Sequence, residues 1–105
     1  MTSTLAAQAF ENLVLEYRDV EGVVVDIDGL LVNGTVFAFL SGDDIVVDLP
    51  AGRASDLVER EQGTRFRIDG IKSRDLVKVS DRALWSELAR EAHAYVGEPP
   101  VGGQS

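Results

Sequence analysis

Apolar residues recur at helical spacing near both ends of the chain. In 4–18 they fall three or four positions apart, at Ala6, Phe10, Leu13, Val14 and Tyr17. In 80–97 a longer stripe comprises Leu84, Trp85, Leu88, Ala89, Ala92, Tyr95 and Val96. The pattern predicts a first helix capped by Thr2, Ser3 or Thr4 and a last helix capped by Ser80. Leu15 falls on the polar side of the first helix, and the sequence gives no reason for it.

The centre of the chain has the shorter periods that are typical of strands. Apolar runs rich in β-branched residues cover 23–27, 30–32, 35–40 and 45–49. The segments between them, Asp28-Gly29, Asn33-Gly34 and 41–44, have the composition of tight turns. Short turns between consecutive runs predict an antiparallel meander, in which the clearest hairpin joins 35–40 to 45–49.

A short helix and two more strands complete the pattern. Pro50 suits the first turn of a helix, and Ala54, Leu57 and Val58 give that helix an apolar face, which ends near Gly63. Charged and apolar residues alternate in 65–69 and 76–79, which predicts strands with one face in water, joined by a loop over 70–74. The segment 98–105 is rich in Pro and Gly, and we expect a disordered tail there.

The order of these elements favours one class of fold. Strands and helices do not alternate, so a parallel, doubly wound sheet is not expected. We predict an α+β two-layer sandwich, with N-terminal, middle and C-terminal helices on one face of a mostly antiparallel sheet of about five strands. A single domain over 1–97 fits a chain of 105 residues, because a chain of this size can bury one modest core.

Composition narrows the classes of function. The chain has no cysteine and one histidine, so zinc knuckles, redox pairs and Cys–His nucleophiles are excluded. The first ten residues hold no Lys or Arg, and no apolar run approaches the roughly 20 residues of a membrane span. We therefore expect a cytoplasmic protein. A net charge of -8 argues against nucleic acid as the main partner, because phosphates would be repelled.

The charge is unevenly distributed along the chain. Segment 64–82 holds six basic and three acidic side chains, whereas 1–63 holds three basic and twelve acidic ones. We expect the basic side chains to gather on the sheet face away from the helices, with Phe66, Ile68 and Val79 on the buried face. Such a face would receive an acidic protein partner. The candidate partner-binding residues are Arg65, Arg67, Lys72, Arg74 and Lys78.

The string from Val23 to Gly29 resembles the nucleophile strand of haloacid-dehalogenase-type phosphatases. In that family the first Asp of Asp-x-Asp is the nucleophile and the second is the acid or base. The chemistry also needs a parallel sheet, a later Ser/Thr and Lys, and late acidic residues for magnesium, and this chain is too short for that fold. We therefore reject the phosphatase interpretation of Asp26 and Asp28, and we interpret Asp28-Gly29 as a turn.

The acidic first half of the chain suggests a metal site as an alternative function. Oxygen ligands suit calcium, magnesium, manganese or ferrous iron, and they are offered here by Glu11, Glu16, Asp19, Glu21, Asp26 and Asp28. Their spacing forms no chelating motif, so we assign no metal ligand and no cofactor. His93 lies at the margin of the last helical stripe, where a boundary position is favoured over a catalytic one.

Several segments are similar to one known family. They are Gly34-Thr35-Val36-Phe37-Ala38, Ile45-Val46-Val47-Asp48-Leu49-Pro50, Leu57-Val58 before Gly63, Leu76-Val77-Lys78-Val79, and Trp85 to Ala92 with Tyr95-Val96. Over about 30–97 the chain resembles the N-terminal domain of the TfoX competence-regulator family, especially its small single-domain actinobacterial versions. The resemblance implies an α+β fold related to YjbR and frataxin-like proteins, and it carries over no catalytic residue.

The chain departs from that family at two places. The usual Met-Phe-Gly segment before the first strand is replaced around Asp26-Ile27-Asp28-Gly29, and the basic residue often found before Leu-Pro is Asp48. We expect a small, non-enzymatic protein-interaction or regulatory domain that is a monomer or weak dimer. The alternative is a weak metal-binding, frataxin-like module.

Overall fold

The computed structural model describes residues 3–26, 29–67 and 75–97. These ranges contain, in chain order, α1 (Thr4–Tyr17), β1 (Val23–Asp26), β2 (Gly29–Val32), β3 (Thr35–Ser41), β4 (Asp44–Asp48), α2 (Ala51–Glu59), β5 (Thr64–Phe66), β6 (Leu76–Val79), the 3-10 helix η1 (Arg82–Leu84) and α3 (Trp85–Gly97). Every strand pair is antiparallel, and the sheet has the order β1-β2-β3-β4-β6-β5.

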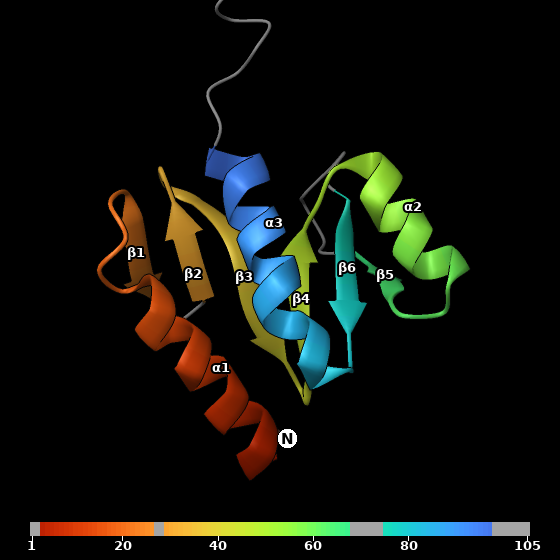
Figure 1. Ribbon diagram of the computed structural model, residues 1–105, viewed down its shortest axis with the longest axis horizontal. Coiled ribbons are helices and arrows are strands. Elements are labelled where there is room, and N and C mark those ends of the chain that lie inside the picture. Colours follow the sequence, from red (N-terminus) through yellow and green to blue (C-terminus); the bar gives the residue numbers. More distant parts are fainter. Residues whose placement is uncertain (1–2, 27–28, 68–74, 98–105) are drawn as a thin grey trace, which may run out of the picture.

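The three helices cover one face of this sheet (Figure 1). In the view of Figure 1, α3 crosses β3 and β4, α1 lies toward the β1 end, and α2 lies at the opposite end above β5 and β6. The predicted two-layer α+β sandwich is confirmed, with six strands in place of about five. The predicted loop over 70–74 and the predicted tail over 98–105 lie outside the described residues.

Tight turns with positive φ angles set the register of the meander. Asn33 and Gly34 have φ angles of 52° and 84°, which are the angles of a type I′ turn between two strands. In the next turn Gly42 has a φ angle of 61°, and it follows Ser41, which pairs with Asp44. These two turns confirm the predicted hairpins, because both hold consecutive strands in antiparallel register.

A β-bulge at Phe37 places two adjacent side chains of β3 in the core. The register of β2 on β3 slips by one residue there, and the normal alternation of faces is interrupted. Phe37 and Ala38 are consequently both buried. The Phe37 ring lies 5.5 Å from the Tyr17 ring of α1 and 5.4 Å from the His93 ring of α3, centroid to centroid. One bulged residue of the sheet thus contacts both terminal helices.

The core fills the space between the helices and the sheet. Trp85 is its largest buried side chain, and the indole N–H donates a hydrogen bond of 3.1 Å to the Val79 carbonyl. The other buried members come from the three α-helices and from four of the strands, β2, β3, β4 and β6, and they include Leu13, Leu30, Val32, Ile45, Val47, Leu49, Leu57, Val77 and Leu88. The first and last helices, α1 and α3, therefore pack on one core.

The helix caps are partly as predicted. The Ser3 hydroxyl accepts a hydrogen bond of 3.1 Å from the Ala6 N–H, so Ser3 caps α1. The predicted cap at Ser80 is wrong. Asp81 accepts from the Ala83 N–H at 3.0 Å and opens η1, so that α3 begins only at Trp85. The carboxylate one residue later takes one of the free N–H groups at the start of the helix, and the Leu84 N–H donates to the Asp81 carbonyl in a 3-10 turn.

Candidate functional site

The basic residues proposed as a partner-binding face are divided between the two faces of the sheet. Arg65 pairs with Val77, and Thr64 pairs with Lys78. Paired residues of antiparallel strands point to the same face, and Val77 is in the core under the helices. Arg65 therefore lies on the helix side, and Lys78 lies on the open side. The prediction of one common face is wrong for this pair.

Of the described basic side chains, Arg65 and Lys78 have acidic neighbours, and Arg67 lies outside the strands. Arg65 donates to the Asp75 carboxylate at 3.0 Å and to the Ser55 hydroxyl of α2 at 2.8 Å. Lys78 Nζ lies 3.9 Å from the nearer carboxylate oxygen of Asp44. Arg67 is exposed beyond the end of β5. The other two candidates, Lys72 and Arg74, lie outside the described residues, so a partner-binding role for the set stays a prediction.

The open face of the sheet is more apolar than the alternation in 65–69 predicts. Phe66 was expected on the buried face beneath the helices, and this is wrong. The centroid of its ring lies 5.7 Å from that of the Phe39 ring, and the two ring planes make an angle of 69°. Phe39 is on β3 and Phe66 is on β5, so the two rings meet across β4 and β6, which lie between these strands. Val46 of β4 is fully buried although it faces this side. The sheet therefore buries apolar side chains on both faces, and the periodicity of β5 alone does not tell which face carries the helices.

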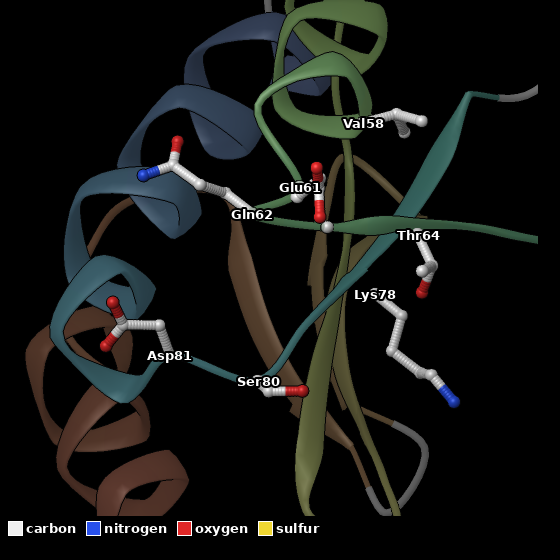
Figure 2. Close-up of a pocket in the computed structure, with 8 residues that line it drawn as sticks. Val58, Glu61, Gln62, Thr64, Lys78, Ser80 and Asp81 are labelled. Carbon is white, nitrogen blue, oxygen red and sulfur yellow. The ribbon is translucent and has the colours of Figure 1, made fainter.

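A polar hollow opens where α2 ends and β5 begins (Figure 2). It is lined by Val58, Glu61, Gln62, Gly63, Thr64, Lys78, Ser80 and Asp81. Figure 2 shows that the side chains of Gln62, Lys78 and Asp81 point in different directions, and Asp81 is engaged as the η1 cap. The described groups do not converge on one point, as the general acid and base of a catalytic site must.

A second hollow lies between α1 and the edge strand β1, and it is lined by the groove residues Glu11, Val14, Leu15, Arg18 and Val25. The four helical members are spaced by three, four and seven, so they form one stripe of α1. Leu15 is 54% exposed and Val25 is 44% exposed. This α1–β1 groove was missed in the sequence, although the unexplained Leu15 was the signal that pointed to it.

The groove lies at the end of the sheet. β1 is the outermost strand, and β2 is its neighbour on one side (Figure 1). Val24, on the face of β1 opposite to Val25, is 58% exposed. An unpaired edge with exposed aliphatic side chains is a surface to which another strand can add.

Acidic side chains predominate in the segment that forms the groove, although the groove lining itself holds one acid, Glu11, and one base, Arg18. The described segment 3–26 contains one base, Arg18, and the carboxylates Glu11, Glu16, Asp19, Glu21 and Asp26. Within the described ranges no three histidine, aspartate or glutamate side chains come together as a group that could hold a metal ion. Asp28, the remaining member of the predicted acidic set, is outside those ranges. The segment that carries the groove therefore has a net negative charge.

The Asp-x-Asp-Gly string has a structural explanation at its glycine. Gly29 has a φ angle of 137°, and a Cβ atom there would lie 2.5 Å from the Ala38 carbonyl oxygen and 2.7 Å from the Phe39 Cβ. Only glycine permits such a close approach of β2 to β3. Asp26 ends β1 and pairs with Gly29 in an antiparallel hairpin, unlike the parallel strand that the phosphatase chemistry needs.

His93 is enclosed by aromatic rings. Its ring centroid lies 5.5 Å from that of Tyr17 and 5.4 Å from that of Phe37, and its buried Nε2 has no hydrogen-bond partner among the described residues. Burial, helped by the Glu16 carboxylate, raises the pKa of the Tyr17 hydroxyl above its usual value of 10.0. No nucleophile in the described ranges is hydrogen-bonded to His93, so the ring is part of the packing between α1, β3 and α3.

Comparison with known proteins adds no assignment. No helix in the described ranges combines the length and the apolar character needed to cross a membrane. The chain matches no family model, no curated protein and no solved structure. The resemblance to the TfoX N-terminal domain therefore stays a prediction, and the α1–β1 groove and its charges are the basis for assigning a function.

Proposed function

We propose that this protein is a non-enzymatic interaction domain that binds another protein at the α1–β1 groove. The observation that carries the proposal is the exposure of Leu15 and Val25 on two adjacent elements, beside an unpaired strand edge. Leu15 and Val25 line the same hollow together with the charged Glu11 and Arg18, and adjoining apolar side chains with a polar rim mark interaction surfaces. The free energy gained by covering them would favour association.

The electrostatics of the described residues support this surface over the basic one. Arg65 is held by Ser55 and Asp75, and its guanidinium would have to leave them to contact a partner. The groove residues need no such exchange, because Leu15 and Val25 already face solvent. Binding at the groove therefore requires less rearrangement of the domain.

Leu15→Glu tests the proposal, and α1 itself supplies a matched control. Leu5 is also an aliphatic residue of α1, is 64% exposed and does not line the groove. Exposed substitutions change stability by only about 0.5 kcal/mol, so both Leu15→Glu and Leu5→Glu should fold. Proteins captured from native cytosol would be compared by mass spectrometry. A partner that is retained by wild type and Leu5→Glu and lost by Leu15→Glu is expected; a partner set that both variants keep would contradict the proposal.

A further inference from the structure

We propose that the partner binds by adding a strand to the outer edge of β1, and that this strand has a short apolar centre flanked by Lys or Arg. The inference rests on the proposed protein-binding function and specifies the mode of binding and the chemistry of the partner. Strand addition uses main-chain hydrogen bonds for affinity and side-chain contacts for specificity.

The hydrogen-bond pattern identifies the groups that β1 offers. The Asn33 N–H donates to the Gly22 carbonyl at 3.1 Å, so these two residues form a hydrogen-bonded pair. Such pairs alternate along antiparallel strands, and the register Val24↔Leu31 continues the alternation. Val24 therefore bonds inward to β2, whereas the main-chain groups of Val23 and Val25 point outward.

Three of the outward groups are available to an added strand. The Val23 N–H is used by the Val20 carbonyl at 3.1 Å. The Val23 carbonyl and the N–H and carbonyl of Val25 remain, and no hydrogen bond from the described residues reaches the outward groups of Val25. An incoming strand would pair with these groups and place one side chain beside Val25 and Leu15, in the groove. The next side chain would lie beside Val24 on the open face.

The charges at the two ends of β1 select the partner. Glu21 precedes the three valines and Asp26 follows them, so an apolar centre with basic flanks matches both ends. A second copy of this chain does not match. In either strand direction, pairing of β1 with β1 brings carboxylates toward carboxylates, and each chain carries a net charge of -8.

The probe is a short capped peptide with a valine-rich centre and Lys or Arg at both ends. One matched peptide carries Glu at those ends, and a second carries N-methyl groups on the residues that face β1. The protein variants are Val25→Pro, which removes the outward N–H and leaves the β1–β2 bonds in place, and Val25→Thr, which keeps that N–H. Amide NMR shifts would report both the affinity and the position of binding.

We expect the basic peptide to bind wild type and Val25→Thr, with the largest shifts in Val23–Asp26 and α1. Val25→Pro should weaken binding by up to about tenfold, as expected from losing one main-chain hydrogen bond. The acidic and N-methylated peptides should bind the wild-type protein about as weakly as the basic peptide binds Val25→Pro. The N-methylated peptide tests the same hydrogen bonds on the wild-type protein, so the inference stays testable if Val25→Pro does not fold.

Two results would overturn the inference. Equal binding of the N-methylated and unmodified basic peptides would show attraction by charge alone, and no binding of the basic peptide would exclude the proposed partner chemistry. In either case, a cytosolic partner that is still lost by Leu15→Glu and kept by Leu5→Glu would leave the proposed function standing without strand addition.

Discussion

Gly29 and Gly52 differ in how much space a side chain would have at each position. A Cβ at position 29 would meet β3 backbone and side-chain atoms at 2.5–2.7 Å, whereas a Cβ at position 52, in α2, meets nothing within 4 Å. Gly29→Ala should therefore destabilise the fold by about 2 kcal/mol or more, because overpacking and the positive φ angle both oppose it.

Gly52→Ala is the matched control and should stabilise the fold by up to about 1 kcal/mol, because alanine loses less conformational freedom in a helix. Urea unfolding of the two variants beside the wild type gives both changes in the free energy of unfolding. A Gly29→Ala protein as stable as wild type would mean that β2 and β3 are not packed as closely as described.

At the scale of the elements, Arg53 joins α2 to α3. Its guanidinium lies 2.9 Å from Glu91 and 3.5 Å from Glu87, both on α3, and 2.9 Å from Asp56 on its own helix. The hydrogen bond to Glu91 is the largest cause that raises the pKa of Arg53. Arg60 bonds only Asp56 among the described carboxylates. Arg53→Gln should lower the free energy of unfolding by about 1 kcal/mol, and Arg60→Gln should lower it by less.

The contribution of Arg53 should depend on pH. Hydrogen bonds from Arg60 first and Arg53 second hold the pKa of Asp56 below its usual value of 3.8. A carboxyl whose pKa is lowered by folding stabilises the fold above its usual pKa, and this contribution is lost as the pH falls through the lowered value. The stability gap between wild type and Arg53→Gln, measured by urea unfolding, should therefore shrink from neutral pH to below about pH 4. A gap that does not change with pH would contradict the ion-pair explanation.

The elements differ in how far local pattern determines them. The helix over 4–18, the hairpin around Gly42 and the last helix follow from spacing and turn chemistry, which are local. Local pattern does not determine which face of β5 carries the helices, because an alternating sequence fits either orientation of the strand. The contact that distinguishes the two is between Phe66 and Phe39, which lie on strands separated by two others. The predicted start of the last helix is wrong because Ser80 and Asp81 are both good caps, and their residue types alone do not tell which one opens the helix. Tyr95, expected in the apolar stripe, is exposed at the end of that helix.

At the scale of the whole molecule, the fold class could be predicted and the site could not. The order of helices and strands restricts the chain to an antiparallel sheet with helices on one face. The α1–β1 groove, in contrast, needs the distance between two elements and the position of β1 at the edge of the sheet. Neither is a property of the local sequence. In the pattern of apolar and polar positions, the groove is indicated only by Leu15, an apolar residue on the otherwise polar face of the first helix.

The outward edge of β1 is where the partner strand would add, and amide hydrogen exchange at Val24 and Val25 tests this most directly. In the free protein the Val25 N–H should exchange much faster than the Val24 N–H, because Val24 is bonded to β2 and Val25 faces solvent. With the basic peptide or a captured partner bound, Val25 should become protected to a degree similar to Val24. A bound partner that leaves the exchange of Val25 unchanged would contradict the account.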